Sequence, residues 1–344
     1  MLSPLTETAN KPNVCETGAR KMREMGAMKI GFIGLGNVGG KLAGSLLRNG
    51  HDVSVRDLDR AAAQPFLNQG AEWADSPRTM AEKADLVITC LPSPAASAAV
   101  MEAEDGILAG MRPGLIWAEM STTDEAEVKR LGALVTEKGG EPVDCPVSGG
   151  CHRAATGNIA IFAGCERATF ERMLPVLTTM GRRILHTGPL GSASVLKVVT
   201  NYLATANLIS LSEALVTAER SGMDLSTTYE AIRISSGNSF VHETESQVIL
   251  NGSRDISFTM DLVSKDIGLF QAVADRAGVP LELNPVMIGI FKDGEARYGG
   301  RELSPNIIRR LEEATGADVR APGFPAEMVD DEAEEPGYEV VVRR

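Results

Sequence analysis

The chain has 344 residues, of which 43% are hydrophobic and 23% charged, a globular composition with room for two domains and a sizeable core. Its formal net charge of −12 at pH 7 argues against nucleic acid or an anionic membrane as the main partner, and no apolar run is long enough to span a bilayer. Five cysteines without a Cys-x-x-Cys pair are predicted to be reduced thiols, and four histidines without metal-ligand spacing predict no metal site.

Residues 1–28 form a polar extension ahead of the first regular pattern. The extension contains Glu7, Glu16 and Glu24, which argue against a transit peptide, and it lacks the apolar segment of a signal peptide. We expect it to lie outside the folded domains, and we expect a cytoplasmic protein.

Residues 29–57 have the pattern of a strand, a helix and a second strand. The apolar run 30–33 is followed by G-x-G-x-x-G, then by a helical segment and by a strand at 52–56 that ends in an acid. This order is typical of a dinucleotide-binding unit, in which the pyrophosphate lies against backbone N–H groups at a helix start. The expected cofactor contacts are Gly34, Leu35, Gly36, Asn37, Val38, Gly39 and Asp57.

Asp57 also predicts which dinucleotide is preferred. Its carboxylate is placed to accept hydrogen bonds from the adenosine ribose, and it would repel a 2′-phosphate. Arg56 and Arg60 lie close in sequence and could contact such a phosphate. We therefore expect NAD, with NADP as a possible cofactor.

Alternating strands and helices continue to about residue 190 and predict a doubly wound Rossmann-type sheet over 29–190. The expected strands cover 85–91, 115–119, 142–145, 158–163 and 184–186, and the expected helices cover 65–70, 79–84, 95–101 and 124–138, with 71–73 as a short link. Pro92 begins a loop at the carboxyl end of one strand, where open α/β sheets bind their ligands.

The second half of the chain carries only helical patterns. A long apolar-faced helix is expected at 192–221, followed by helices at 225–235, 240–250, 260–278, 285–299 and 304–316. We expect an all-α domain over 191–320, joined to the sheet by the long helix. The acidic C-terminal tail covers 321–344, and its segment 330–339 is predicted to be solvated or docked on a partner.

Two groups of residues could carry chemistry. Residues 148–150, here called the carboxylate loop, would present a hydroxyl and consecutive backbone N–H groups to a carboxylate, with His152 and Arg153 adding positive charge; a plain turn is the alternative. Lys197 lies among apolar residues on the long helix, one turn before Asn201. Burial would lower its pKa and make it a general acid/base, whereas the alternative is a surface lysine whose stem alone is buried.

Several motifs in order resemble those of the β-hydroxyacid dehydrogenases, the family of 3-hydroxyisobutyrate dehydrogenase and tartronate semialdehyde reductase. They run from about residue 30 to 317 and comprise GFIGLGNVGG, CLP at 90–92, Ser121-Thr122, DCPVSGG at 144–150, the Lys197 and Asn201 pair, and Lys265-Asp266. Departures from the family pattern occur at Cys145, Thr200, Arg153 and Phe240.

The resemblance implies a Rossmann domain, a long linking helix and a helical domain shared in homodimers or homotetramers. It implies hydride transfer between a nicotinamide and the β-hydroxyl of a small 3-hydroxy acid, with no metal. Lys197 and Asn201 fall on catalytic positions, and the substrate positions fall on Ser148, Gly149, Gly150 and Phe240. Further cofactor contacts fall on Leu91, Pro92, Thr122 and Lys265.

Three other functions are considered for this sequence. A semialdehyde or imine reductase that uses NADPH would share the fold, but imine reductases lack the catalytic lysine. A short-chain dehydrogenase is disfavoured because Ala206, not lysine, follows Tyr202 by four residues. A non-catalytic dinucleotide-binding scaffold is the alternative from another functional class, and Lys197 argues against it.

Overall fold

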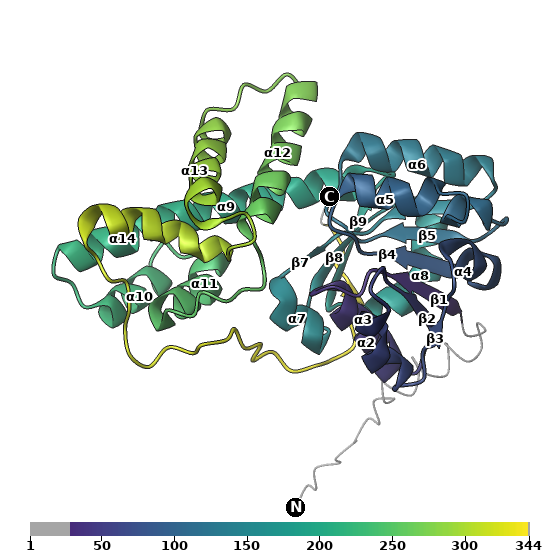
Figure 1. Cartoon of the computed structure of the whole chain (residues 1–344), viewed down its shortest axis with the longest axis horizontal. Coiled ribbons are helices and arrows are strands. Elements are labelled where there is room, and N and C mark those ends of the chain that lie inside the picture. The colour runs from purple at the N-terminus through teal and green to yellow at the C-terminus, as the bar shows by residue number, and fades with distance from the viewer. Residues whose placement is uncertain (1–27, 343–344) are drawn as a thin grey trace, which may run out of the picture.

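The computed structural model describes residues 28–342, so the expected N-terminal extension lies almost entirely outside the described residues. Figure 1 shows an open α/β sheet with helices on its faces, followed by a helical half that projects to one side, with α9 (Ser192–Arg220) running from one into the other. The α/β fold with a helical C-terminal part, expected from the sequence, is thereby confirmed. No helix among residues 28–342 is long and apolar enough to cross a membrane.

The sheet has ten strands within the described residues, in the order β10-β9-β8-β6-β5-β4-β1-β2-β3, with β7 paired to β8. All neighbours are parallel except the β6–β8 and β7–β8 pairs. The strands are β1 Lys29–Ile33, β2 Asp52–Arg56, β3 Glu72–Trp73, β4 Leu86–Thr89, β5 Ile116–Glu119, β6 Glu141–Asp144, β7 Val147–Ser148, β8 Ala160–Gly164, β9 Arg183–Gly188 and β10 Tyr338–Glu339.

The central strands are apolar because helices cover both faces of the sheet. All four residues of β4 and of β5 are buried. One hydrophobic core joins the sheet to α2, α3, α7 and α8, and a second joins its other face to α4, α5 and α6. These helices are α2 Gly39–Arg48, α3 Arg60–Leu67, α4 Pro77–Lys83, α5 Pro94–Glu102, α6 Glu125–Glu137, α7 Gly150–Thr156 and α8 Arg167–Met180, with a 3-10 turn at Ile107–Ala109.

The helical half packs around α9 and has its own hydrophobic core. Asp144, at the end of β6, caps α9: its carboxylate accepts hydrogen bonds from the N–H groups of Gly191 at 2.8 Å and Ser194 at 2.7 Å. The sheet therefore fixes where the long helix begins. The other helices are α10 Leu225–Arg233, α11 Phe240–Asn251, α12 Met260–Arg276, α13 Leu283–Tyr298 and α14 Arg309–Thr315, with a 3-10 turn at Ser304–Ile308.

Some elements differ from the sequence-based expectation. Helix α3 begins at Arg60, because the Asp59 carboxylate accepts a hydrogen bond from Ala61 N–H at 2.9 Å. The expected link at 71–73 is the edge strand β3. Helix α8 was not predicted, since Pro175 reads as an interruption, but the structure holds this proline inside the helix.

The C-terminal tail (residues 321–342) returns from the helical half to the sheet, as the yellow segment in Figure 1 shows. There it adds β10 in parallel beside β9. Its acids meet arginines: Arg167 donates to both carboxylate oxygens of Glu339, at 2.5 and 2.9 Å, and Arg183 donates to Glu332 at 2.8 Å. This differs from the solvated or partner-docked tail that the acidic sequence predicts, because the tail binds the sheet of its own chain.

Candidate active site

The glycine loop (residues 34–39) connects β1 to α2 and has the shape that a dinucleotide needs. A side chain at Gly39 would place its Cβ 2.1 Å from the carbonyl oxygen of Gly34, so the loop can close only with glycine there. By contrast, nothing lies within 4 Å of a Cβ built at Gly36, and this open side is where a pyrophosphate could approach. A cavity of about 330 Å³ adjoins the loop and is lined by Leu35, Gly36, Asn37, Gly40, Lys41 and Ser257.

Asp57 closes the glycine loop from the end of β2. One carboxylate oxygen accepts a hydrogen bond from Leu35 N–H at 2.7 Å, and the other accepts one from Asp59 N–H at 3.0 Å. Arg56 points to the β3 side, where it donates to the carbonyl of Ala74 at 3.0 Å, and its guanidinium lies 5.6 Å from the centre of the Trp73 ring. The Arg60 guanidinium lies over the same ring at 5.1 Å.

A buried network joins the ends of β4 and β5. Leu91 N–H donates to Ser121 Oγ at 2.7 Å, and both Ser121 N–H, at 2.9 Å, and the Ser121 hydroxyl donate to Glu119 Oε1. Glu119 is 1% exposed, and burial raises its pKa. The next residue, Thr122, accepts a hydrogen bond at its carbonyl from Lys265 Nζ at 2.9 Å, which ties this edge of the sheet to α12. Glu119 was missed by the sequence reasoning, although an acid at the end of an apolar strand was a usable signal.

The second cluster centres on Lys197, one turn inside α9. Lys197 Nζ donates to Asn201 Oδ1 at 2.8 Å, and Asn201 Nδ2 donates to Asp266 Oδ2 at 2.5 Å. Asp266 is 2% exposed and forms an ion pair with Lys265 at 2.8 Å. Four side chains from α9 and α12 therefore form one connected polar group, and Lys265 links it to the carboxyl end of β5.

The surroundings of Lys197 change its acidity. The residue is 9% exposed, so its amine does not reach solvent as that of a surface lysine would. Burial lowers its pKa to about 8; the charge of Lys265 also lowers it, while Asp266 works in the opposite direction. A usable fraction of the amine is therefore neutral near neutral pH, as a general base requires.

The carboxylate loop runs from β7 into α7. Gly149 and Gly150 have φ values of +132° and +88°, a region that favours glycine. Arg153 lies directly behind the loop, with its Cδ 3.3 Å from a Cβ built at Gly149, and its guanidinium lies 4.8 Å from the centre of the Phe240 ring. Burial lowers the pKa of His152, so Arg153 carries the positive charge at this place.

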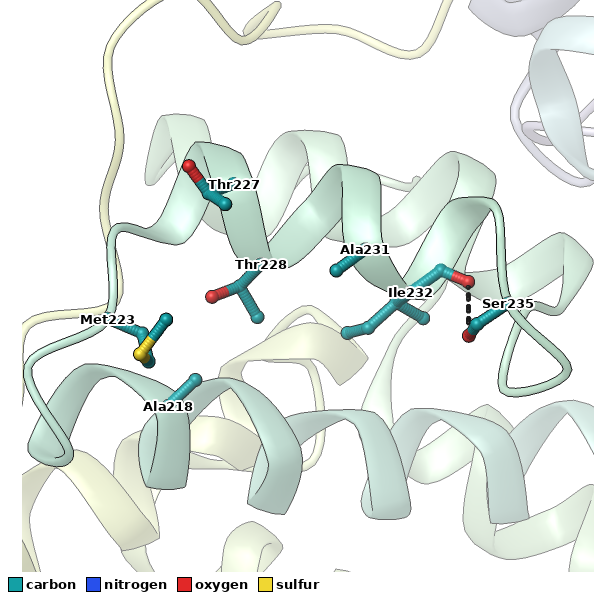
Figure 2. A pocket seen from close by; sticks show the side chains of 7 residues that line it. All are labelled: Ala218, Met223, Thr227, Thr228, Ala231, Ile232 and Ser235. Atoms are coloured by element: carbon teal, nitrogen blue, oxygen red, sulfur yellow. Dashed lines mark hydrogen bonds between the residues drawn. The ribbon is translucent and has the colours of Figure 1, made fainter.

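The structure leaves some predicted site residues apart. Among residues 28–342, no hydrogen bond joins the carboxylate loop to Lys197, although Asp144, just before the loop, caps the helix that carries Lys197. Pro92 is exposed in the loop after β4, and Val38 packs against the hydrophobic core of the sheet. A cavity of about 370 Å³ lies between α9 and α10 in the helical half, with Met223 and Ile232 in its lining, and none of these predicted site residues lines it (Figure 2).

The four described cysteines are free thiols, three of them buried and Cys90 half-buried. Burial raises the pKa of Cys90 and of Cys165 to about 12, and it also raises those of Cys145 and Cys151. The thiols are therefore protonated and poor nucleophiles. Among residues 28–342, no group of three or more His, Cys, Asp or Glu side chains is placed to hold a metal ion.

Comparisons with known families cover both halves of the chain. Residues 29–188 match the family described as the NAD binding domain of 6-phosphogluconate dehydrogenase. Residues 191–311 match the family described as NAD-binding of NADP-dependent 3-hydroxyisobutyrate dehydrogenase. The two matches divide the chain just before α9 and identify the protein as one that binds NAD or NADP.

Individual relatives agree with these matches. The chain is 35% identical to 2-(hydroxymethyl)glutarate dehydrogenase of Eubacterium barkeri, over 85% of this chain and 98% of that protein. It is 32% identical to NAD-dependent L-serine dehydrogenase of Pseudomonas aeruginosa, over 83% and 98% of the two chains. The structure of Mycobacterium tuberculosis 3-hydroxyisobutyrate dehydrogenase with L-serine is similar with a TM-score of 0.75 at 27% identity, over 83% of this chain and 99% of the other. The chain therefore belongs to the β-hydroxyacid dehydrogenases and is an NAD(P)-dependent oxidoreductase.

Proposed function

We propose that the protein is a 3-hydroxyacid dehydrogenase that transfers a hydride between NAD and the β-hydroxyl of a small carboxylic acid, with Lys197 as general acid/base. The observation that carries this proposal is the buried lysine with a pKa of about 8, hydrogen-bonded to Asn201 at 2.8 Å. Oxidation of an alcohol needs a proton acceptor beside the hydroxyl, and a neutral amine is suited to that task.

The cofactor would be held by residues from both halves of the chain. The glycine loop would bind the pyrophosphate, Asp57 the adenosine ribose, and Leu91, Pro92, Thr122 and Lys265 the nicotinamide end. When bound, NAD supplies the group that accepts or returns the hydride. We favour NAD over NADP because the Asp57 carboxylate lies at the end of β2, whereas the described contacts hold Arg56 on the Trp73 side.

In the second cluster, Lys197 would transfer the proton and Asn201 would position the groups. Lys197, neutral at the start, would take the proton of the β-hydroxyl during oxidation and give it back during reduction. Asn201 would hold both Lys197 and the substrate hydroxyl. Its amide has a defined orientation, because Nδ2 donates to Asp266 and Oδ1 accepts from Lys197.

The substrate would bind between the two halves through its carboxylate. Ser148, Gly149 and Gly150 would hold that carboxylate, and Phe240 would cover the apolar part of the molecule. L-Serine and 2-(hydroxymethyl)glutarate, the substrates named for two relatives, both carry a hydroxyl on the carbon β to a carboxylate. This shared chemistry supports a 3-hydroxy acid as the substrate class.

The assembly is also a proposal. Helix α9 keeps Leu203 53% exposed and Leu196 38% exposed, apolar surface that a second copy would cover. We propose a homodimer or homotetramer with α9 near the interface. Light scattering at micromolar concentration should give at least twice the chain mass of 36.5 kDa, and a species of only that mass would contradict the proposal.

A nicotinamide absorbance assay over a panel of hydroxy acids tests the function directly. The panel should contain 3-hydroxyisobutyrate, L-serine, 2-(hydroxymethyl)glutarate and, as controls with an oxidisable secondary hydroxyl at C2, 2-hydroxybutyrate and 2-hydroxyglutarate. We expect turnover of at least one 3-hydroxy acid with NAD, and little turnover of the 2-hydroxy acids. Reduction of imines, but no turnover of any hydroxy acid in either direction, would favour the reductase alternative.

A further inference from the structure

Arg153 is a cation beside the proposed substrate site that the proposed chemistry does not use. It lies on α7, one turn after the carboxylate loop. Its Cδ is 3.3 Å from a Cβ built at Gly149, and its guanidinium is 4.8 Å from the centre of the Phe240 ring. The side chain is 28% exposed. Arg153 thus lies beside two of the four residues proposed to bind substrate.

The acids behind Arg153 hold it in place without occupying its donors. Asp330 and Glu332 of the C-terminal tail lie 3.9 and 3.8 Å from its nitrogens, beyond hydrogen-bond distance. Both acids have closer partners: Asn158 donates to Asp330 at 2.7 Å, and Arg183 donates to Glu332 at 2.8 Å.

The N–H groups of Arg153 therefore remain available. Within residues 28–342, no hydrogen bond uses the Arg153 guanidinium, which has five N–H donors in a fork that matches a carboxylate. The family match ends at residue 311, so the tail acids that support Arg153 lie outside the part shared with that family.

We propose that Arg153, with Phe240 beside it, is a subsite for a second anionic group, and that the preferred substrates are 3-hydroxy acids with a second carboxylate. This inference rests on the proposed function, because it takes residues 148–150 as the place of the first carboxylate. The Phe240 ring would cover the short aliphatic segment between the two carboxylates. An acid without the second carboxylate would leave the Arg153 fork unpaired.

The test compares a dicarboxylate with an analogue in which the second carboxylate is replaced by a neutral amide. Arg153→Met removes the charge and keeps a long side chain over Phe240, whereas Arg153→Lys retains the charge but not the fork. Arg167→Met is the control, because it removes an arginine that pairs with the tail at Glu339 without touching Gly149, Phe240 or the two acids beside Arg153. For each protein, kcat/KM should be measured on 2-(hydroxymethyl)glutarate and on its distal monoamide.

We expect the wild-type protein and Arg167→Met to prefer the dicarboxylate by roughly tenfold to a hundredfold, the range for hydrogen bonds to a charged group. Arg153→Met should abolish this preference while its activity on the monoamide changes little, and Arg153→Lys should recover part of it. Equal losses on both substrates in Arg153→Met, or a wild-type protein without preference, would overturn the subsite.

A binding measurement separates this inference from the proposed function. Calorimetric titration of the NAD-loaded protein with glutarate and with its monoamide glutaramate needs no turnover. If no hydroxy acid is turned over but glutarate still binds more tightly through Arg153, the proposed function fails and the anion subsite stands. If hydroxy acids are turned over and the two ligands bind equally well, the subsite fails and the proposed function stands.

Discussion

The two halves of the candidate site are built in different ways. The cofactor half is local in sequence: residues 34–57 supply both the glycine loop and the acid that closes it, mostly through the backbone. The proposed proton-transfer half joins residues that are far apart in the chain through their side chains, from Lys197 and Asn201 on α9 to Asp266 on α12. A change in the first half should therefore alter cofactor affinity, and a change in the second half should alter turnover.

Lys197→Ala should give the largest effect, a loss of turnover without a loss of NAD affinity. General acid/base groups contribute about 10²–10⁴-fold in rate, so kcat should fall by that order while the Kd for NAD hardly changes. Lys197→Arg should be nearly as inactive, because a guanidinium stays protonated and cannot act as a base. Steady-state kinetics and NAD titration of the same preparations measure both effects. A parallel loss of NAD affinity would show that the two halves are not separable.

Two glycine variants should weaken NAD binding for different reasons. Gly36→Ala places its methyl group in open space, so the protein should fold with an unchanged Tm but bind NAD at least about tenfold more weakly, equivalent to about 1.4 kcal/mol. Gly39→Ala directs its methyl group against the Gly34 carbonyl at 2.1 Å, so both Tm and NAD affinity should fall. Thermal melts and NAD titrations test the contrast, and unchanged NAD affinity in Gly36→Ala would argue against a pyrophosphate at this loop.

Asp57→Ala should have a smaller effect, on the preference for NAD over NADP. We expect the wild-type protein to have a higher kcat/KM with NAD than with NADP. In the variant, the ratio of these two kcat/KM values should fall by about tenfold, the lower end of the range for a charged hydrogen bond. The variant also loses the bond to Leu35 N–H, so activity with NAD should fall more than activity with NADP rises. A wild-type preference for NADP would mean that Arg60 or Arg56 outweighs the carboxylate.

The same contrast explains what the sequence could predict. The βαβ unit, the doubly wound sheet and the helical second half follow from local periodicity and glycine spacing, and the structure confirms that fold. Glu119 was missed because its role depends on Ser121 and on Leu91 of the neighbouring strand. Strand β10 was missed because two residues pair with an edge about 150 positions earlier, and short acidic segments carry no strand pattern.

The pH dependence of oxidation tests the central claim, that buried Lys197 is the general base, most directly. The pKa of Lys197 is lowered to about 8, so the neutral base is scarce at low pH and predominates above that value. For the wild-type protein, kcat/KM for oxidation should rise about tenfold per pH unit below pH 8 and level off above it. Lys197→Ala should lack this limb and stay slow throughout. A Lys197→Ala protein that is folded, binds NAD and keeps both the limb and near-wild-type turnover would contradict the account.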